Sequence, residues 1–216
     1  MQKIMKRVFN LLIVDESGSM SVIERQALAG INETLSTIKK MQHIHKDLDQ
    51  RVTLLTFDSA RTNFIYDNVS GWKIHQLRPQ DYNPGGCTPL YDAIGRGISR
   101  INAQVSDGDS VLVTIITDGE ENSSTEYRLN MIKNLIEKLK KQNWTFTFIG
   151  TDNLDVEGMA GEMGIDNHLE FKQDEAGTRE MFACENRVRA CFYEDVAASR
   201  HMPLGDYFRR GQKRKR

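Results

Sequence analysis

The stretch Phe9–Met20, FNLLIVDESGSM, decides the fold of this chain. Val8–Val14 is aliphatic almost throughout and hardly alternates with polar residues, which is typical of a central parallel strand buried on both faces. The acids, serines and glycine that follow cannot extend this strand, and a helical spacing of apolar residues begins after Met20. The stretch therefore predicts a strand, a polar loop and a helix. The polar side chains lie at the carboxyl end of the strand, where open α/β sheets bind ligands.

The rest of the chain repeats this alternation of strand and helix. Further strands are predicted at 51–57, 61–69, 109–117, 144–149 and 168–171. Helices are predicted at about 21–41, 89–105, 127–141, 154–163 and 178–199. The segment 61–69 follows a tight turn and is expected to form an antiparallel edge strand. This order predicts a doubly wound α/β sheet that is mostly parallel, has one antiparallel edge strand and carries helices on both faces.

Length and charge set the domain organisation. A chain of 216 residues can bury one substantial core, so we expect a single domain over 1–200 and a basic, flexible tail over 201–216. The formal net charge is −1, which favours neither a nucleic-acid nor a membrane partner. The basic end Arg209–Arg216, RRGQKRKR, is the only hint of nucleic-acid binding, and we expect a solubilising tail there instead.

Hydropathy and cysteine usage indicate the compartment. The sequence has no apolar run of the length that crosses a membrane. The apolar stretch near the amino terminus runs into the polar loop without the small-residue cleavage site of a signal peptide. The three cysteines are widely spaced and include no CxxC pair, which favours a reducing compartment. We therefore expect a cytoplasmic protein.

Three short motifs place oxygen-bearing side chains at predicted strand ends or helix starts. Asp15, Ser17 and Ser19 lie in the loop after the first strand. Thr88 stands in GGCTPLYDAI, with its hydroxyl expected at an exposed loop, and Asp118 follows the strand at 109–117. Oxygen ligands of mixed charge suit Mg²⁺ or Mn²⁺ rather than Zn²⁺. Each motif also has a structural alternative, because Ser, Thr and Asp are common in turns and at helix N-caps.

Together the motifs resemble those of the von Willebrand factor A (VWA) family. The match consists of Asp15-x-Ser17-x-Ser19, Thr88 in GGCTPLYDAI and Asp118 in ITDGEENSS, and the element order fits from about residue 7 to 199. The resemblance implies a metal-ion-dependent adhesion site, in which Ser17, Ser19 and Thr88 ligate the cation by their hydroxyls. Asp15 and Asp118 then act directly or through bound water.

This resemblance also implies a function. Family members of this type are non-enzymatic protein-binding modules whose Mg²⁺ (or Mn²⁺) takes up an Asp or Glu carboxylate of a partner protein. The sequence is similar to stand-alone, intracellular bacterial members. Glu16, Glu120, Glu121 and Asp92 are expected to form an acidic rim that selects a carboxylate flanked by Lys or Arg.

An enzyme is the alternative. Doubly wound sheets with aspartates at their strand ends also host phosphoryl chemistry, so a Mg²⁺-dependent hydrolase or phosphotransferase is the competing function. Against it, the sequence contains no GxxxxGK[ST] phosphate loop and no convincing Ser/His/Asp arrangement. The binding module is the favoured interpretation.

Overall fold

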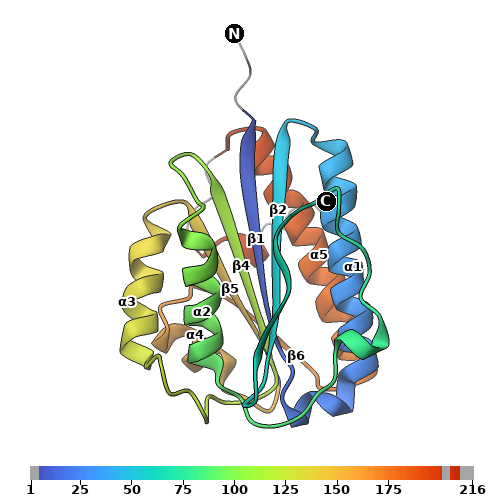
Figure 1. Ribbon diagram of the computed structural model, residues 1–216, viewed down its shortest axis with the longest axis vertical. Helices are drawn as coiled ribbons and strands as arrows, with labels where there is room; N and C mark the ends of the chain where they lie inside the picture. Colours follow the sequence, from blue (N-terminus) through green and yellow to red (C-terminus); the bar gives the residue numbers. More distant parts are fainter. Residues whose placement is uncertain (1–4, 201–204, 210–216) are drawn as a thin grey trace.

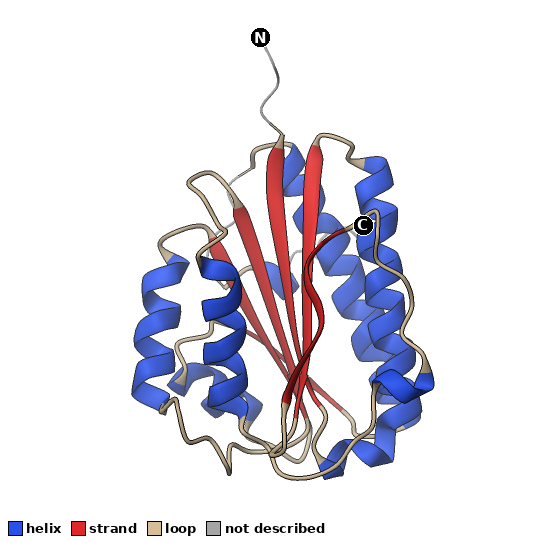
Figure 2. Cartoon of the chain, viewed as in Figure 1, coloured by secondary structure: helices blue, strands red, loops and turns tan. Residues whose placement is uncertain are grey.

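The computed structural model describes residues 5–200 and 205–209, in which strands and helices alternate along the chain (Figures 1 and 2). The elements are β1 (Lys6–Asp15), the 3₁₀ helix η1 (Gly18–Ile23), α1 (Glu24–Ile44), β2 (Leu48–Phe57), β3 (Thr62–Ser70), the 3₁₀ helix η2 (Pro79–Asp81), α2 (Leu90–Asn102), β4 (Ser110–Thr117), α3 (Leu129–Lys140), β5 (Trp144–Thr151), α4 (Val156–Glu162), β6 (Asn167–Phe171) and α5 (Glu175–Ala197). Every predicted strand and helix is present, with limits that shift by a few residues. The first predicted helix differs most, because it opens with the separate 3₁₀ turn η1.

The strands form one six-stranded sheet in the order β3-β2-β1-β4-β5-β6. β1 lies between β2 and β4 and is parallel to both, and β5 and β6 continue the parallel sheet. Only the edge strand β3 runs antiparallel, to β2. The predicted fold class is confirmed, including the antiparallel edge.

Helices cover both faces of this sheet (Figure 1). Leu12 and Val14 of β1 belong to the hydrophobic cluster that contains α1 and α5. Leu11 and Ile13 belong to the second cluster, with α2, α3 and α4. Because neighbouring side chains of the strand enter two different cores, both sets are mostly apolar, which explains the nearly continuous apolar run.

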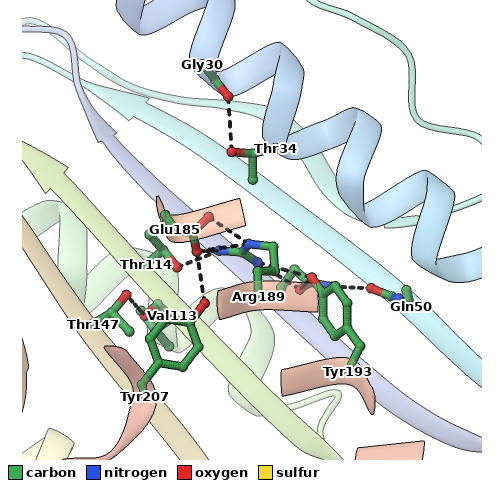
Figure 3. A network of polar contacts seen from close by, with 11 residues as sticks. Gly30, Thr34, Gln50, Val113, Thr114, Thr147, Glu185, Arg189, Tyr193 and Tyr207 are labelled. Atoms are coloured by element: carbon green, nitrogen blue, oxygen red, sulfur yellow. Dashed lines mark hydrogen bonds and ion pairs between the residues drawn. The ribbon is translucent and has the colours of Figure 1, made fainter. Parts of the chain in front are cut away.

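One polar residue interrupts the apolar run of β1. Asn10 is buried on the face covered by α5, where its Oδ1 accepts hydrogen bonds from Arg189 Nη1 (3.1 Å) and Tyr193 Oη (2.5 Å). Arg189 also donates to Glu185 on its own helix and to Thr114 Oγ1 of β4 (2.7 Å). Figure 3 shows this network between α5 and the sheet. It ties α5 to both central strands from inside the core.

The chain after α5 returns to the same core. Tyr207 is buried, its Oη donates to Glu185 Oε1 (3.0 Å) and its backbone N–H donates to Asn167 Oδ1 of β6 (3.0 Å). Of the segment predicted as a tail, 205–209 thus includes a core residue, and 201–204 and 210–216 lie outside the described residues. Within the described ranges, no helix combines the length and the hydrophobicity needed to cross a membrane.

Candidate metal site

The carboxyl ends of the two central strands bring the three motifs together. β1 ends at Asp15, and its parallel neighbour β4 ends at Thr117, directly before Asp118. The loop after β1 carries Ser17 and Ser19 into η1, and Thr88 precedes α2. These loops lie at the lower end of the sheet in Figure 1.

Four of the five predicted residues form one chain of hydrogen bonds. The backbone N–H of Ser17 donates to Asp15 Oδ1 (2.7 Å), and the Oγ atoms of Ser17 and Ser19 lie 3.2 Å apart. Ser19 Oγ then donates to Asp118 Oδ1 (2.6 Å). Asp15, Ser17 and Asp118 are buried, whereas Ser19 is exposed. The cluster therefore opens to solvent at Ser19.

Thr88 joins the cluster through Gly119. A Cβ atom at Gly119 would lie 2.8 Å from Thr88 Oγ1, so only glycine allows this approach. The Thr88 backbone N–H donates to Asn122 Oδ1 (2.8 Å), which holds it against the loop that carries Asp118. Thr88 as a whole is buried, but its hydroxyl oxygen, the group predicted to be exposed, is not sealed from solvent. Thr88 is not an N-cap, because Pro89 holds that position without a side-chain cap.

Asp15 accepts hydrogen bonds from two residues that the sequence analysis did not single out. Thr117 Oγ1 donates to Asp15 Oδ2 (2.5 Å), and Tyr82 Oη donates to the Asp15 backbone oxygen (2.7 Å). Thr117 directly precedes Asp118 and could have been found as the polar end of an apolar strand. Tyr82 lies in the connection 71–84, which has no periodicity, so no sequence signal pointed to it.

Electrostatics at the cluster suit a cation. Burial raises the pKa of Asp15 to about 6, and the nearby Asp118 charge acts in the same direction. Burial also raises the pKa of Asp118. Among the described residues, no Lys, Arg or His forms an ion pair with either aspartate. No group of three or more His, Cys, Asp or Glu that could hold a metal is found in the described ranges, and the donor set here is two carboxylates with three hydroxyls.

The acidic rim expected around the site is largely wrong. Glu16 is fully buried, and one of its carboxylate oxygens accepts a backbone N–H of the β3–α2 connection. Asp92 is buried and accepts the backbone N–H groups of 125–127. Glu121 accepts the backbone N–H groups of Ser123 and Ser124 in its own loop and that of Tyr91 in the first turn of α2. These carboxylates shape the loops by satisfying their N–H groups, and only Glu120 of the four is exposed.

Sequence comparison identifies the family. The family model of the von Willebrand factor type A domain matches residues 11–192. The chain belongs to the VWA domain family. Such domains mediate protein–protein interaction, so membership points to an interaction module. The sequences of curated proteins give no match to the chain.

Solved structures share this VWA fold at low sequence identity. The PilB minor pilin from Streptococcus sanguinis has a TM-score of 0.60 and 13% identity, over 91% of this chain and 63% of PilB. The vWF domain of the type V pili tip protein Mfa5 from Porphyromonas gingivalis has a TM-score of 0.62 and 10% identity, over 92% of this chain and 98% of that domain. The pilus adhesin SpaC from Lactobacillus rhamnosus GG, in its open conformation, has a TM-score of 0.62 and 13% identity, over 90% of this chain and 30% of SpaC. This chain therefore spans less than two thirds of the length of the PilB and SpaC structures.

Proposed function

We propose that this VWA domain is a metal-dependent protein-binding module that holds Mg²⁺ (Mn²⁺ as the alternative) and captures a carboxylate of a partner protein. The proposed ligands, direct or through water, are Asp15, Ser17, Ser19, Thr88 and Asp118. The observation that carries the proposal is the hydrogen bond from Ser19 to Asp118 (2.6 Å). Because the hydroxyl hydrogen points at the carboxylate, Ser17 must be the donor in the Ser17–Ser19 contact, and Ser19 Oγ keeps a second lone pair that is available to a cation.

The state of Thr88 supports the same proposal. Its Oγ1 has no hydrogen-bond partner among the described residues, although the side chain is buried beside Gly119. The Oγ1 atom is not fully enclosed by protein, so its lone pairs can be offered to a cation held by Thr88 and Ser19. The donor set thus fits a hard divalent cation that prefers oxygen ligands.

The balance of charge explains why the partner would supply a carboxylate. Three of the five ligands are neutral hydroxyls, which leave much of the positive charge on a bound Mg²⁺ and favour an anionic ligand at an open coordination position. Ser19 is the exposed member of the cluster, so the partner would approach over η1. The exposed Val22 of η1 would then lie beside the bound partner. We further propose that the module is non-catalytic and works in the bacterial cytoplasm.

Calorimetric titration of MgCl₂ into EDTA-treated protein tests this function. The wild-type chain is expected to bind one Mg²⁺, and both Ser19→Ala and Asp118→Ala are expected to abolish the binding. Ser36→Ala, an exposed serine of α1, is the matched control and should bind like wild type. Absence of Mg²⁺ and Mn²⁺ binding by the wild-type chain would refute the proposal. Metal binding accompanied by metal-dependent hydrolysis of a phosphoester would favour the enzyme instead.

A further inference from the structure

A glutamine from a distant loop reaches the candidate site. Gln173 lies between β6 and α5, and its Nε2 donates to Asp118 Oδ2 (2.5 Å). Its own backbone N–H donates to Asp152 Oδ1 (3.2 Å) in the β5–α4 loop, and the Asp152 N–H donates to the Phe171 oxygen (2.8 Å). Hydrogen bonds to the end of β5 and the loop after it therefore fix the backbone at Gln173, and from there its side chain reaches Asp118.

This contact gives the second oxygen of the Asp118 carboxylate a donor of its own. Ser19 donates to Oδ1 and Gln173 donates to Oδ2, so each oxygen has its own neutral donor. Two donors on different oxygens fix the rotation of a carboxylate, which a single donor leaves free to turn. Because the Gln173 amide is uncharged, it orients Asp118 without neutralising the carboxylate. A Lys or Arg at this position would compete with a metal ion for the negative charge of Asp118.

We propose that Gln173 is a positioning residue for the metal site. By holding Oδ2 of Asp118, the Gln173 amide keeps Oδ1 on Ser19 and so preforms the arrangement that receives the cation. This inference rests on the proposed function and adds a residue outside the three motifs. Partners that orient metal ligands are part of a metal site, since their removal lowers metal affinity even though they never touch the ion.

The test compares Mg²⁺ affinity and metal-free stability in the same variants. Gln173→Met keeps the length of the side chain and removes its donor. We expect it to weaken Mg²⁺ binding by about tenfold in calorimetry while its melting temperature in EDTA stays close to that of wild type. Gln76→Met, an exposed glutamine on the β3–α2 connection, is the control and should change neither quantity.

A second variant gives a readout of opposite sign. Gln173→Glu places a carboxylate against Asp118 Oδ2, so its melting temperature in EDTA should fall below that of wild type. Mg²⁺ should then raise that temperature by more than it does in wild type, because the cation screens the two charges. An unchanged melting temperature in EDTA would show that the two side chains do not meet in solution and would overturn the inference.

The two proposals fail in different ways. If wild type binds Mg²⁺ and Gln173→Met binds it equally well, the positioning role is wrong and the metal site stands. If Gln173→Met lowers only the metal-free melting temperature, the residue is structural and the inference is overturned. If wild type binds neither Mg²⁺ nor Mn²⁺, both proposals fall.

Discussion

Arg189 and Glu185 form an ion pair inside the core, with Arg189 Nη2 lying 2.7 Å from Glu185 Oε1 and the two side chains 0% and 1% exposed. Both residues lie on α5 and contact the sheet or the returning chain end. Coulombic attraction to Glu185, working against burial, holds the pKa of Arg189 well above its usual range. The Arg189 guanidinium is therefore charged in the folded state, and Glu185, Asn10 and Thr114 accept its hydrogen bonds.

Removal of the buried Arg189 guanidinium should lower the stability of the fold. Arg189→Met removes the cation that pairs with the buried Glu185 side chain, and we expect a loss of about 3–5 kcal/mol in the free energy of unfolding. Urea denaturation measures the loss. Arg179→Met is the matched control, because Arg179 pairs with Glu175 at the same spacing on the same helix but at the surface. That control should lose less than about 1 kcal/mol, and equal losses would contradict the role of burial.

The chain end after α5 should contribute to stability. Tyr207→Phe removes only the hydroxyl that donates to Glu185 and is expected to cost about 1 kcal/mol. Tyr207→Ala also empties the buried ring site and is expected to cost about 3–5 kcal/mol. Tyr127→Phe, whose hydroxyl lies at an exposed contact with Ser99, serves as the control. Thermal denaturation would contradict the prediction if Tyr207→Ala melted like wild type.

Gly119 should be required for the proposed metal site rather than for the fold. A methyl group at Gly119 would meet Thr88 Oγ1 at 2.8 Å and push the hydroxyl from its place. Gly119→Ala is thus expected to weaken Mg²⁺ binding on the order of tenfold in calorimetry. At Gly161 of α4 an added Cβ meets nothing within 4 Å, so Gly161→Ala is the control. Wild-type affinity in Gly119→Ala would argue against Thr88 as a ligand.

Asp92 should link loop stability to pH. Burial alone would raise the pKa of Asp92, but the backbone N–H groups of 125–127 outweigh it, and the pKa is lowered. A carboxyl with a lowered folded-state pKa stabilises the protein above its unfolded-state pKa, and this stability is lost as the pH falls through the folded-state value. Asp92→Asn is therefore expected to destabilise the fold at pH 7 by about 1–3 kcal/mol, with the difference from wild type shrinking below pH ~4.

The pH series of unfolding free energies checks this expectation. Asp107→Asn, at an exposed aspartate, is the control and should follow wild type at every pH. A cost of Asp92→Asn that stayed constant down to pH ~2 would show that hydrogen-bond geometry rather than charge is responsible.

Local sequence determined the fold and the membership of the candidate metal site. The run from Val8 to Val14 indicated a strand buried on both faces, because side chains that alternate between two cores are mostly apolar. The neighbouring strand β4 shows the same pattern, whereas the edge strands β3 and β6 are only partly buried. Parallel strands end at one edge of a sheet, so Asp15 and Asp118 could be placed together from their positions alone. The antiparallel edge was predictable for a separate reason: the turn between β2 and β3 is too short for the crossover that a parallel pair needs.

Tertiary structure alone decided the partners of the buried charges. Glu185–Arg189 and Glu175–Arg179 have the same i,i+4 spacing on one helix, yet one pair is buried and the other exposed. Gln173 meets Asp118 only because β6 and β4 end at the same edge of the sheet. The periodicity of apolar residues indicates which face of an element is buried. It does not record which polar group from another element satisfies a given charge, and that depends on how the elements pack.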